Sequence, residues 1–302
     1  MVTKTIFSDG EATDPIYRNI RSRQNAYTSS AYEKCEKLWE QYERFADPEF
    51  LKEIKSNFQS RYWEMYLTVF LINEGYEVKC PKPGPDVGIE IDGLRVWFEA
   101  TCPTSGQISH PDQILQLTYG GGKAYKVPNE KIILRYLNSI SEKYNNQYKK
   151  WREKEIVSAA DVFIIALNPI KIPHEIGDTV PPRILQAAFK VGAPYVALNP
   201  KSGEVIDKGY QFRDAIHKAS SSEPIPCGVF QQKSYAGLSA LLCSRVDGFN
   251  EPKEMGLDFQ LVPNPHAKIP LPPHFRLKGA YFVVTKNEAE YCINAISDFD
   301  VR

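Results

Sequence analysis

Two acidic residues occupy unexpected positions in GPDVGIEIDGLRVWFEATC, residues 84–102, a stretch typical of a short β-hairpin. Asp86 precedes the first strand, and Glu99 lies near the end of the second strand within an otherwise apolar run. The Asp92-Gly93 pair favours a two-residue type I′ turn, because both positions of that turn need a positive φ. With this turn Asp86 lies directly opposite Glu99, and opposed residues have Cβ atoms roughly 4.5–5.5 Å apart on one face of the sheet.

The side chains along the two strands support this pairing, because successive residues of a strand point to opposite faces of the sheet. One face of the predicted hairpin is entirely apolar and holds Val87, Ile89, Ile91, Leu94, Val96, Phe98 and Ala100. On the other face Glu90 opposes Arg95. Gly88 opposes Trp97 there and leaves room for the indole ring. The turn and the alternation therefore predict the same register.

The facing carboxylates of Asp86 and Glu99 repel each other unless one of them takes up a proton or a cation binds between them. Mg²⁺ suits such a position, since it binds one or two carboxylates and keeps several waters. The hairpin therefore predicts that Asp86 and Glu99 are ligands of Mg²⁺ or Mn²⁺. The alternative is that both acids lie at a solvated sheet edge and bind nothing.

A third acidic residue, Glu64, interrupts the apolar sequence RYWEMYLTVFLI, residues 61–72. Charged side chains are rarely buried without a partner. On a helix, residues three and four apart are neighbours, so a narrow polar stripe runs through Asn57, Arg61, Glu64 and Thr68. The stripe makes Glu64 a third candidate site residue. The alternative is an exposed stripe on an amphipathic helix.

The elements that must position these acids follow the order helix, three strands, helix, strand. We expect helices at about 31–45, 48–75 and 129–154, and strands at 76–80, 86–91, 94–101 and 160–169. Beyond residue 170 proline and glycine become frequent, and we expect short strands and short helices at 182–191 and 235–242. The prediction is a mixed α/β protein with a polar arm (1–30), a core (31–169) and an extension or small second lobe (170–302).

The three acids and their order resemble the PD-(D/E)xK nuclease superfamily. The matching motifs are Glu64 on a helix, Pro85-Asp86 at a strand start and Glu99-Ala100-Thr101 late in the next strand, within residues 58–168. The resemblance implies a restriction endonuclease-like αβββαβ core, with a mixed central sheet flanked by helices. It also implies metal-dependent hydrolysis of phosphodiester bonds, of DNA rather than RNA, with Glu64, Asp86 and Glu99 as metal ligands.

The sequence departs from this family at Thr101, where the pattern has a lysine. Some members take the lysine from the following helix, and here Arg135, Ser139, Lys143 and Gln147 form a polar row beside that helix's apolar stripe. We therefore expect Lys143 to replace the missing lysine, with Gln147 beside it binding a phosphate oxygen or a metal-bound water. Lys79 and Lys82 are competing candidates.

Basic residues concentrate between 123 and 154, where nine Lys and Arg residues stand against three acidic ones. Phosphate backbones attract such patches, although the outer face of a long helix is also often basic for solubility. The residues predicted to contact nucleic acid are Arg61, Thr101, Lys123, Lys126 and Arg135.

The whole chain of 302 residues carries 37 basic and 37 acidic residues, so no global charge directs it to nucleic acid. Its first residues do not resemble a signal peptide, and no apolar run is long enough to span a bilayer. With six scattered cysteines that form no CxxC pair, we expect a cytoplasmic protein that does not bind membranes and is compatible with a homodimer. Two alternatives remain open: a nuclease-fold protein that binds nucleic acid without cutting it, and a protein that binds a partner through residues 170–302.

Overall fold

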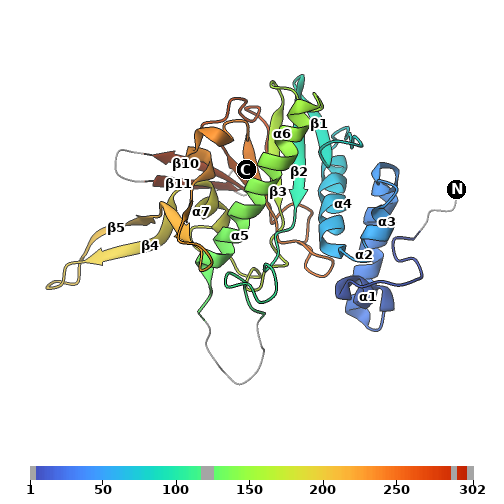
Figure 1. Cartoon of the computed structure of the whole chain (residues 1–302), viewed down its shortest axis with the longest axis horizontal. Coiled ribbons are helices and arrows are strands. Elements are labelled where there is room, and N and C mark those ends of the chain that lie inside the picture. The colour runs from blue at the N-terminus through green and yellow to red at the C-terminus, as the bar shows by residue number, and fades with distance from the viewer. Residues whose placement is uncertain (1–4, 117–125, 287–290, 298–302) are drawn as a thin grey trace.

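A seven-stranded mixed sheet flanked by helices forms the centre of the protein in the computed structural model, which describes residues 5–116, 126–286 and 291–297 (Figure 1). The strand order is β1-β2-β3-β8-β9-β10-β11. Its members are β1 (Val87–Ile91), β2 (Leu94–Thr101), β3 (Val162–Leu167), β8 (Ala240–Cys243), β9 (Gln260–Pro263), β10 (Ala280–Lys286) and β11 (Tyr291–Ser297). This arrangement confirms the mixed α/β class.

The hairpin β1–β2 has the predicted register, with Gly88 paired to Trp97 and Glu90 to Arg95. Both turn residues adopt positive φ, 52° at Asp92 and 77° at Gly93, as a type I′ turn requires. A Cβ atom added to Gly88 would lie 2.3 Å from the Trp97 ring, so only glycine fits beneath the indole. β2 then pairs in parallel with β3, and β3 with β8.

Helices cover both faces of this sheet and surround its edge. They are α1 (Pro15–Ser22), α2 (Ala26–Tyr42), η1 (Glu43–Phe45), α3 (Phe50–Glu53), α4 (Phe58–Asn73), α5 (Asn129–Glu142), the π-helix η2 (Lys143–Tyr148), α6 (Lys149–Glu153), α7 (Arg183–Ala188), η3 (Val229–Gln231) and η4 (Lys233–Tyr235). In Figure 1 α5 and α6 lie across the front of β2 and β3, while α4 and the N-terminal helices lie to one side of β1 and β2.

Two hydrophobic clusters occupy the two sides of the sheet, as the alternation in β2 requires. Val96 and Phe98 pack with α4 in one cluster, and Trp97 packs with α5 and α6 in the other. Trp63 of α4 also donates its indole N–H to the Ala166 carbonyl of β3, at 2.9 Å. The helix that carries Glu64 is thereby fixed against the sheet.

Several predicted elements differ in the structure. Residues 76–80 were expected to form a strand, but they pair with β1 only through an isolated bridge between Lys79 and Gly88. The helix expected at 48–75 is divided into α3 and α4, and η2 interrupts the one expected at 129–154. The helix expected at 235–242 is instead the end of η4 followed by β8.

The two ends of the chain contribute to the same body. Tyr17 and Ile20 of α1 are fully buried in the cluster on the α4 side, so residues expected as a polar arm form part of the core. Residues after 170 supply β8 to β11 of the central sheet. They also form two separate hairpins, β4 (Val191–Leu198) with β5 (Val205–Phe212), and β6 (Ala215–His217) with β7 (Pro224–Pro226).

Candidate active site

A polar pocket of about 340 Å³ opens at the end of the β1–β2 hairpin. Its lining residues come from α3, α4, the start of β1, the end of β2 and the π-helix η2: Glu53, Asn57, Ser60, Arg61, Glu64, Asp86, Ala100, Thr101, Cys102 and Lys143. We call it the acidic pocket. It brings together four of the predicted site residues, namely Glu64, Asp86, Lys143 and Thr101, with the predicted phosphate contact Arg61.

Asp86 is held at the entrance to β1 by a backbone contact across the hairpin. Its Oδ2 accepts a hydrogen bond from the Ala100 N–H at 2.7 Å. Burial, followed by the carboxylates of Glu99 and Glu64, raises the pKa of Asp86 well above its ordinary value, and Lys143 and the Ala100 N–H lower it only in part. The Asp86 carboxylate therefore lies where additional positive charge would be stabilising.

Glu99 lies behind Lys143 and is almost completely buried. The Lys143 ammonium donates to Glu99 Oε1 at 2.8 Å, and the Trp151 indole N–H is 3.4 Å from Oε2. Burial disfavours the charged lysine, but Glu99 and then Asp86 outweigh it and raise the pKa of Lys143, which keeps it protonated. The structure thus brings the predicted replacement lysine into direct contact with the second hairpin acid.

The position of Lys143 depends on an irregularity in its helix. α5 ends at Glu142, and Lys143 is the first residue of η2. Such π-helical segments inside α-helices are frequent at functional sites. Gln147 lies half-buried in the same π-helix but is not among the residues that line the acidic pocket.

Glu64 approaches the acidic pocket from α4, on the other side of the sheet from Lys143. Both of its carboxylate oxygens have partners. Tyr42 donates its hydroxyl to Glu64 Oε1 at 2.7 Å, and Arg61 donates to Oε2 at 2.6 Å. Lys82 lies 3.5 Å from Oε1. Arg61 also pairs with Asp47 and Glu53, so its charge is shared among three carboxylates.

The predicted metal ligands do not form a preformed three-ligand cluster: within the described residues, no group of three or more His, Cys, Asp and Glu side chains is placed to hold an ion. Asp86 and Glu99 nevertheless offer the carboxylate oxygens that Mg²⁺ and Mn²⁺ bind. Burial and the neighbouring carboxylates raise the pKa of Asp86, and a cation beside it would favour its charged form. Glu99 does not line the acidic pocket and its oxygens contact Lys143 and Trp151, so a divalent ion at this pair would have to displace the Lys143 ammonium. Glu64 fits only if Arg61 and Lys82 release it.

Thr101 lines the acidic pocket, where its hydroxyl is paired with the Ser139 hydroxyl at 2.8 Å. The remaining predicted nucleic-acid contacts lie elsewhere. Arg135 donates to the Asp112 carbonyl at 2.5 Å beside a separate cavity. Lys126 is exposed, and Lys123 lies outside the described residues. Of the two competing lysines, Lys82 contacts Glu64, while Lys79 pairs with Glu90 on the exposed part of β1.

Sequence reasoning missed two groups that hold the acids. Tyr42 belongs to α2, 22 residues before Glu64, and no local pattern connects the two. The indole N–H of Trp151, which belongs to the apolar stripe of its helix, is directed at Glu99. A buried indole usually needs a hydrogen-bond acceptor, and this requirement is the signal that could have identified the contact.

Comparisons of this chain with protein-family models, with curated proteins and with solved structures found no match. In the part of the chain that the structure describes, no helix is both long enough and apolar enough to cross a membrane.

Proposed function

We propose that this protein is a metal-dependent nuclease that hydrolyses phosphodiester bonds, with DNA as the favoured substrate. The observation that carries the proposal is the acidic pocket: Asp86 and Glu64 line it together with Lys143, and Lys143 in turn contacts Glu99. Paired carboxylates beside a partly buried cation, at the end of two strands, are suited to binding a divalent ion and a phosphate group.

In this proposal Asp86 and Glu99 hold a Mg²⁺ or Mn²⁺ ion. When bound, such an ion polarises a phosphoryl oxygen and lowers the pKa of a water molecule. Lys143 lies beside both acids and would stabilise the negative charge that develops on the phosphate. The ammonium group would then exchange its contact with Glu99 for one with the phosphate.

Glu64 and Arg61 take linked roles. In the acidic pocket Arg61 lies against Glu64 at 2.6 Å, so neither charge is available for a ligand. Binding of a phosphate would draw the Arg61 guanidinium away, because guanidinium groups match phosphate oxygens geometrically. Glu64 would then be free to orient a water molecule or to bind a second ion.

A restriction endonuclease-like core is part of the same proposal. Its support is the succession α4, β1, β2, α5, β3, with β2 parallel to β3 and the acids at the end of the hairpin. The first of the three expected strands is represented only by the bridge between Lys79 and Gly88.

The test is incubation of purified protein with single- and double-stranded DNA and RNA in Mg²⁺, Mn²⁺ or EDTA. We expect cutting that requires the metal and falls at least 100-fold in Glu99→Gln and in Lys143→Met. Lys208→Met, which removes an exposed lysine of β5 outside the basic segment 123–154, should cut like the wild type. Equal traces for wild type and Glu99→Gln would remove the proposal.

A second candidate function, nucleic-acid binding without cleavage, is favoured by two observations. Thr101 replaces the expected lysine and is bound to Ser139. Arg61 and Lys82 both contact Glu64, as they would in a site that needs no metal. The same experiment separates the two functions, because a binding protein would retain the nucleic acid equally in Mg²⁺ and in EDTA and leave it intact.

A further inference from the structure

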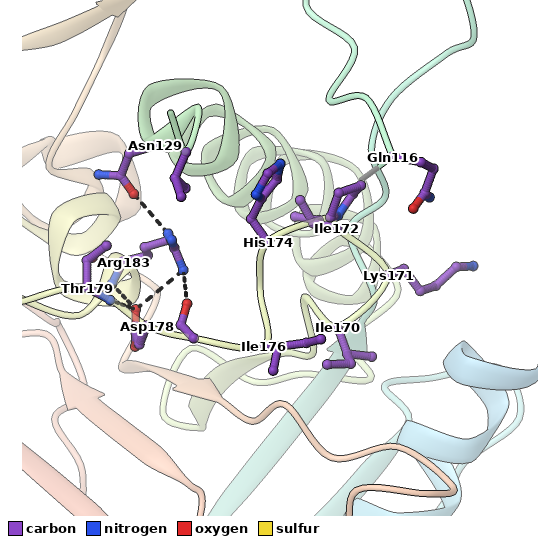
Figure 2. Close-up of a pocket in the computed structure, with 13 residues that line it drawn as sticks. Gln116, Asn129, Ile170, Lys171, Ile172, His174, Ile176, Asp178, Thr179 and Arg183 are labelled. Atoms are coloured by element: carbon purple, nitrogen blue, oxygen red, sulfur yellow. Dashed lines mark hydrogen bonds and ion pairs between the residues drawn. The ribbon is translucent and has the colours of Figure 1, made fainter. Parts of the chain in front are cut away.

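A second and larger cavity, of about 610 Å³, lies at the C-terminal end of β3 (Figure 2). Ile170, Ile172 and Ile176 are among its apolar lining residues, and Lys171, His174 and Arg183 are among its polar ones. We call it the isoleucine pocket. Its size and its mainly apolar walls with a few polar groups are typical of sites for small ligands or parts of larger ones.

The wall formed by Arg183 is rigid and electrically balanced. Arg183 is 2% exposed and donates to the Gly177 carbonyl at 2.7 Å and to Asn129 Oδ1 at 2.8 Å. Glu175, and Asp178 in the lining of the same pocket, each pair with both Arg183 and Arg245. Two acids thus compensate two arginines, and the binding wall is fixed before any ligand arrives.

Lys171 gives the isoleucine pocket its remaining positive charge and connects it to the acidic pocket. Among the described residues Lys171 has no acidic partner, and its ammonium group donates to Asn57 Oδ1 at 3.0 Å. Asn57 lines the acidic pocket, so this contact spans the boundary between the two cavities. The ends of β2 and β3 are also joined beside the two cavities, because the Asn168 N–H donates to the Thr101 carbonyl at 2.8 Å.

Two side chains of the isoleucine pocket lack the partners that would explain their positions. His174 has a left-handed backbone, with φ at 74°, and its imidazole makes no hydrogen bond within the described part of the chain. Figure 2 shows its ring between Asn129 and Ile172. Ile176 at the rim is 81% exposed, so its side chain is accessible to a ligand that enters the isoleucine pocket. A ligand with a flat apolar face and a polar edge would satisfy both residues.

We propose that the isoleucine pocket binds the base of a single-stranded nucleotide adjacent to the phosphate held in the acidic pocket. The proposal rests on the proposed function, since it assigns a second part of the same substrate. A base has the required face and edge, and apolar side chains are known partners for unstacked bases. Lys171, between the cavities, would contact the phosphate that joins the two nucleotides.

The test is fluorescence anisotropy with a single-stranded DNA 12-mer in EDTA, so that binding is measured without hydrolysis. Versions with one abasic site at each successive position scan the strand. For the wild type we expect one position at which loss of the base weakens binding about tenfold. Ile176→Glu should bind the intact strand about tenfold more weakly and show no further loss at that position.

Two further variants make the result specific. His174→Asn removes the imidazole but keeps a residue that tolerates the left-handed backbone, and it should lose about threefold in affinity. Ile206→Glu changes an isoleucine that is 65% exposed on the projecting hairpin of β4 and β5, and it should behave like the wild type. The proposal is overturned if the 12-mer does not bind, if no position depends on its base, or if Ile176→Glu matches Ile206→Glu.

Failure of the nuclease proposal is visible separately. A protein that shows the position-dependent loss in EDTA but does not cut in Mg²⁺ keeps the isoleucine pocket as a base site and loses the enzymatic function. A protein that cuts but shows no coupling between Ile176 and any base loses only the inference made here.

Discussion

Replacement of Lys143 by methionine tests, by a measurement of stability alone, whether Lys143 compensates the buried charge of Glu99. The Lys143 side chain is 21% exposed and that of Glu99 only 5%, with 2.8 Å between their charged atoms. Methionine fills a similar volume but removes the ammonium group. Among the described residues, Glu99 would then keep one hydrogen-bond donor, the Trp151 indole N–H at 3.4 Å.

The expected cost follows from the distance and the burial. At 2.8 Å and an effective dielectric constant of about 20, the attraction amounts to about 6 kcal/mol before any desolvation is counted. Part of this attraction is offset because both charged groups are better hydrated in the unfolded chain. Removing one partner of a buried ion pair typically lowers the free energy of unfolding by about 3–5 kcal/mol. Since Lys143 retains some contact with water, we expect the free energy of unfolding to fall by about 3 kcal/mol at pH 7.

Urea unfolding followed by circular dichroism measures this loss, with Lys149→Met as the control for removing a surface lysine. A double variant, Glu99→Gln with Lys143→Met, should recover part of the stability because no charge is then left unpaired. If Lys143→Met and Lys149→Met differ by less than about 1 kcal/mol, Lys143 does not compensate the charge of Glu99.

Two further predictions concern the hairpin. Gly88→Ala places a Cβ atom 2.3 Å from the Trp97 ring, so the free energy of unfolding should fall by about 2 kcal/mol. Calorimetry measures the effect, and a melting temperature equal to that of the wild type would contradict the described packing. Folding raises the pKa of Asp86, so the folded state binds this proton more tightly than the unfolded state. The protonated Asp86 therefore contributes its full stabilisation below about pH 4, and the contribution is lost as the pH rises through the raised pKa. In Asp86→Asn this part of the pH dependence should disappear in urea titrations between pH 4 and 8, and a pH profile parallel to that of the wild type would count against it.

The parts of the structure that were predictable from the sequence depend on local rules. The register of β1 and β2 follows from the two-residue turn and from alternation, which act over fewer than ten residues on each side. The four-residue spacing of its helix likewise placed Lys143 at the margin of the core. The pairing of its ammonium group with Glu99 was beyond local rules, because it depends on the path of the chain between β2 and α5.

The wrong predictions arose where tertiary pairing decides between equally plausible elements. The apolar sequence around Leu241 is too short for its periodicity to separate a buried strand from a helix, and pairing with β3 and β9 makes it a strand. Residues 76–80 look like a strand but meet β1 at a single bridge. The contacts of Glu64 with Tyr42 and Lys82 were unpredictable for the same reason, since these two residues come from other segments of the chain.

The burial of β3 determines whether residues 1–169 can fold without the rest of the chain. All six of its residues, Val162 to Leu167, are buried, with β2 on one side and β8 on the other. A fragment ending at residue 169 would contain every acid of the proposed site, yet it would present this apolar strand as an open edge to other molecules. Expression of such a fragment should yield aggregates rather than a minimal enzyme, and the two halves of the gene product should melt in one transition.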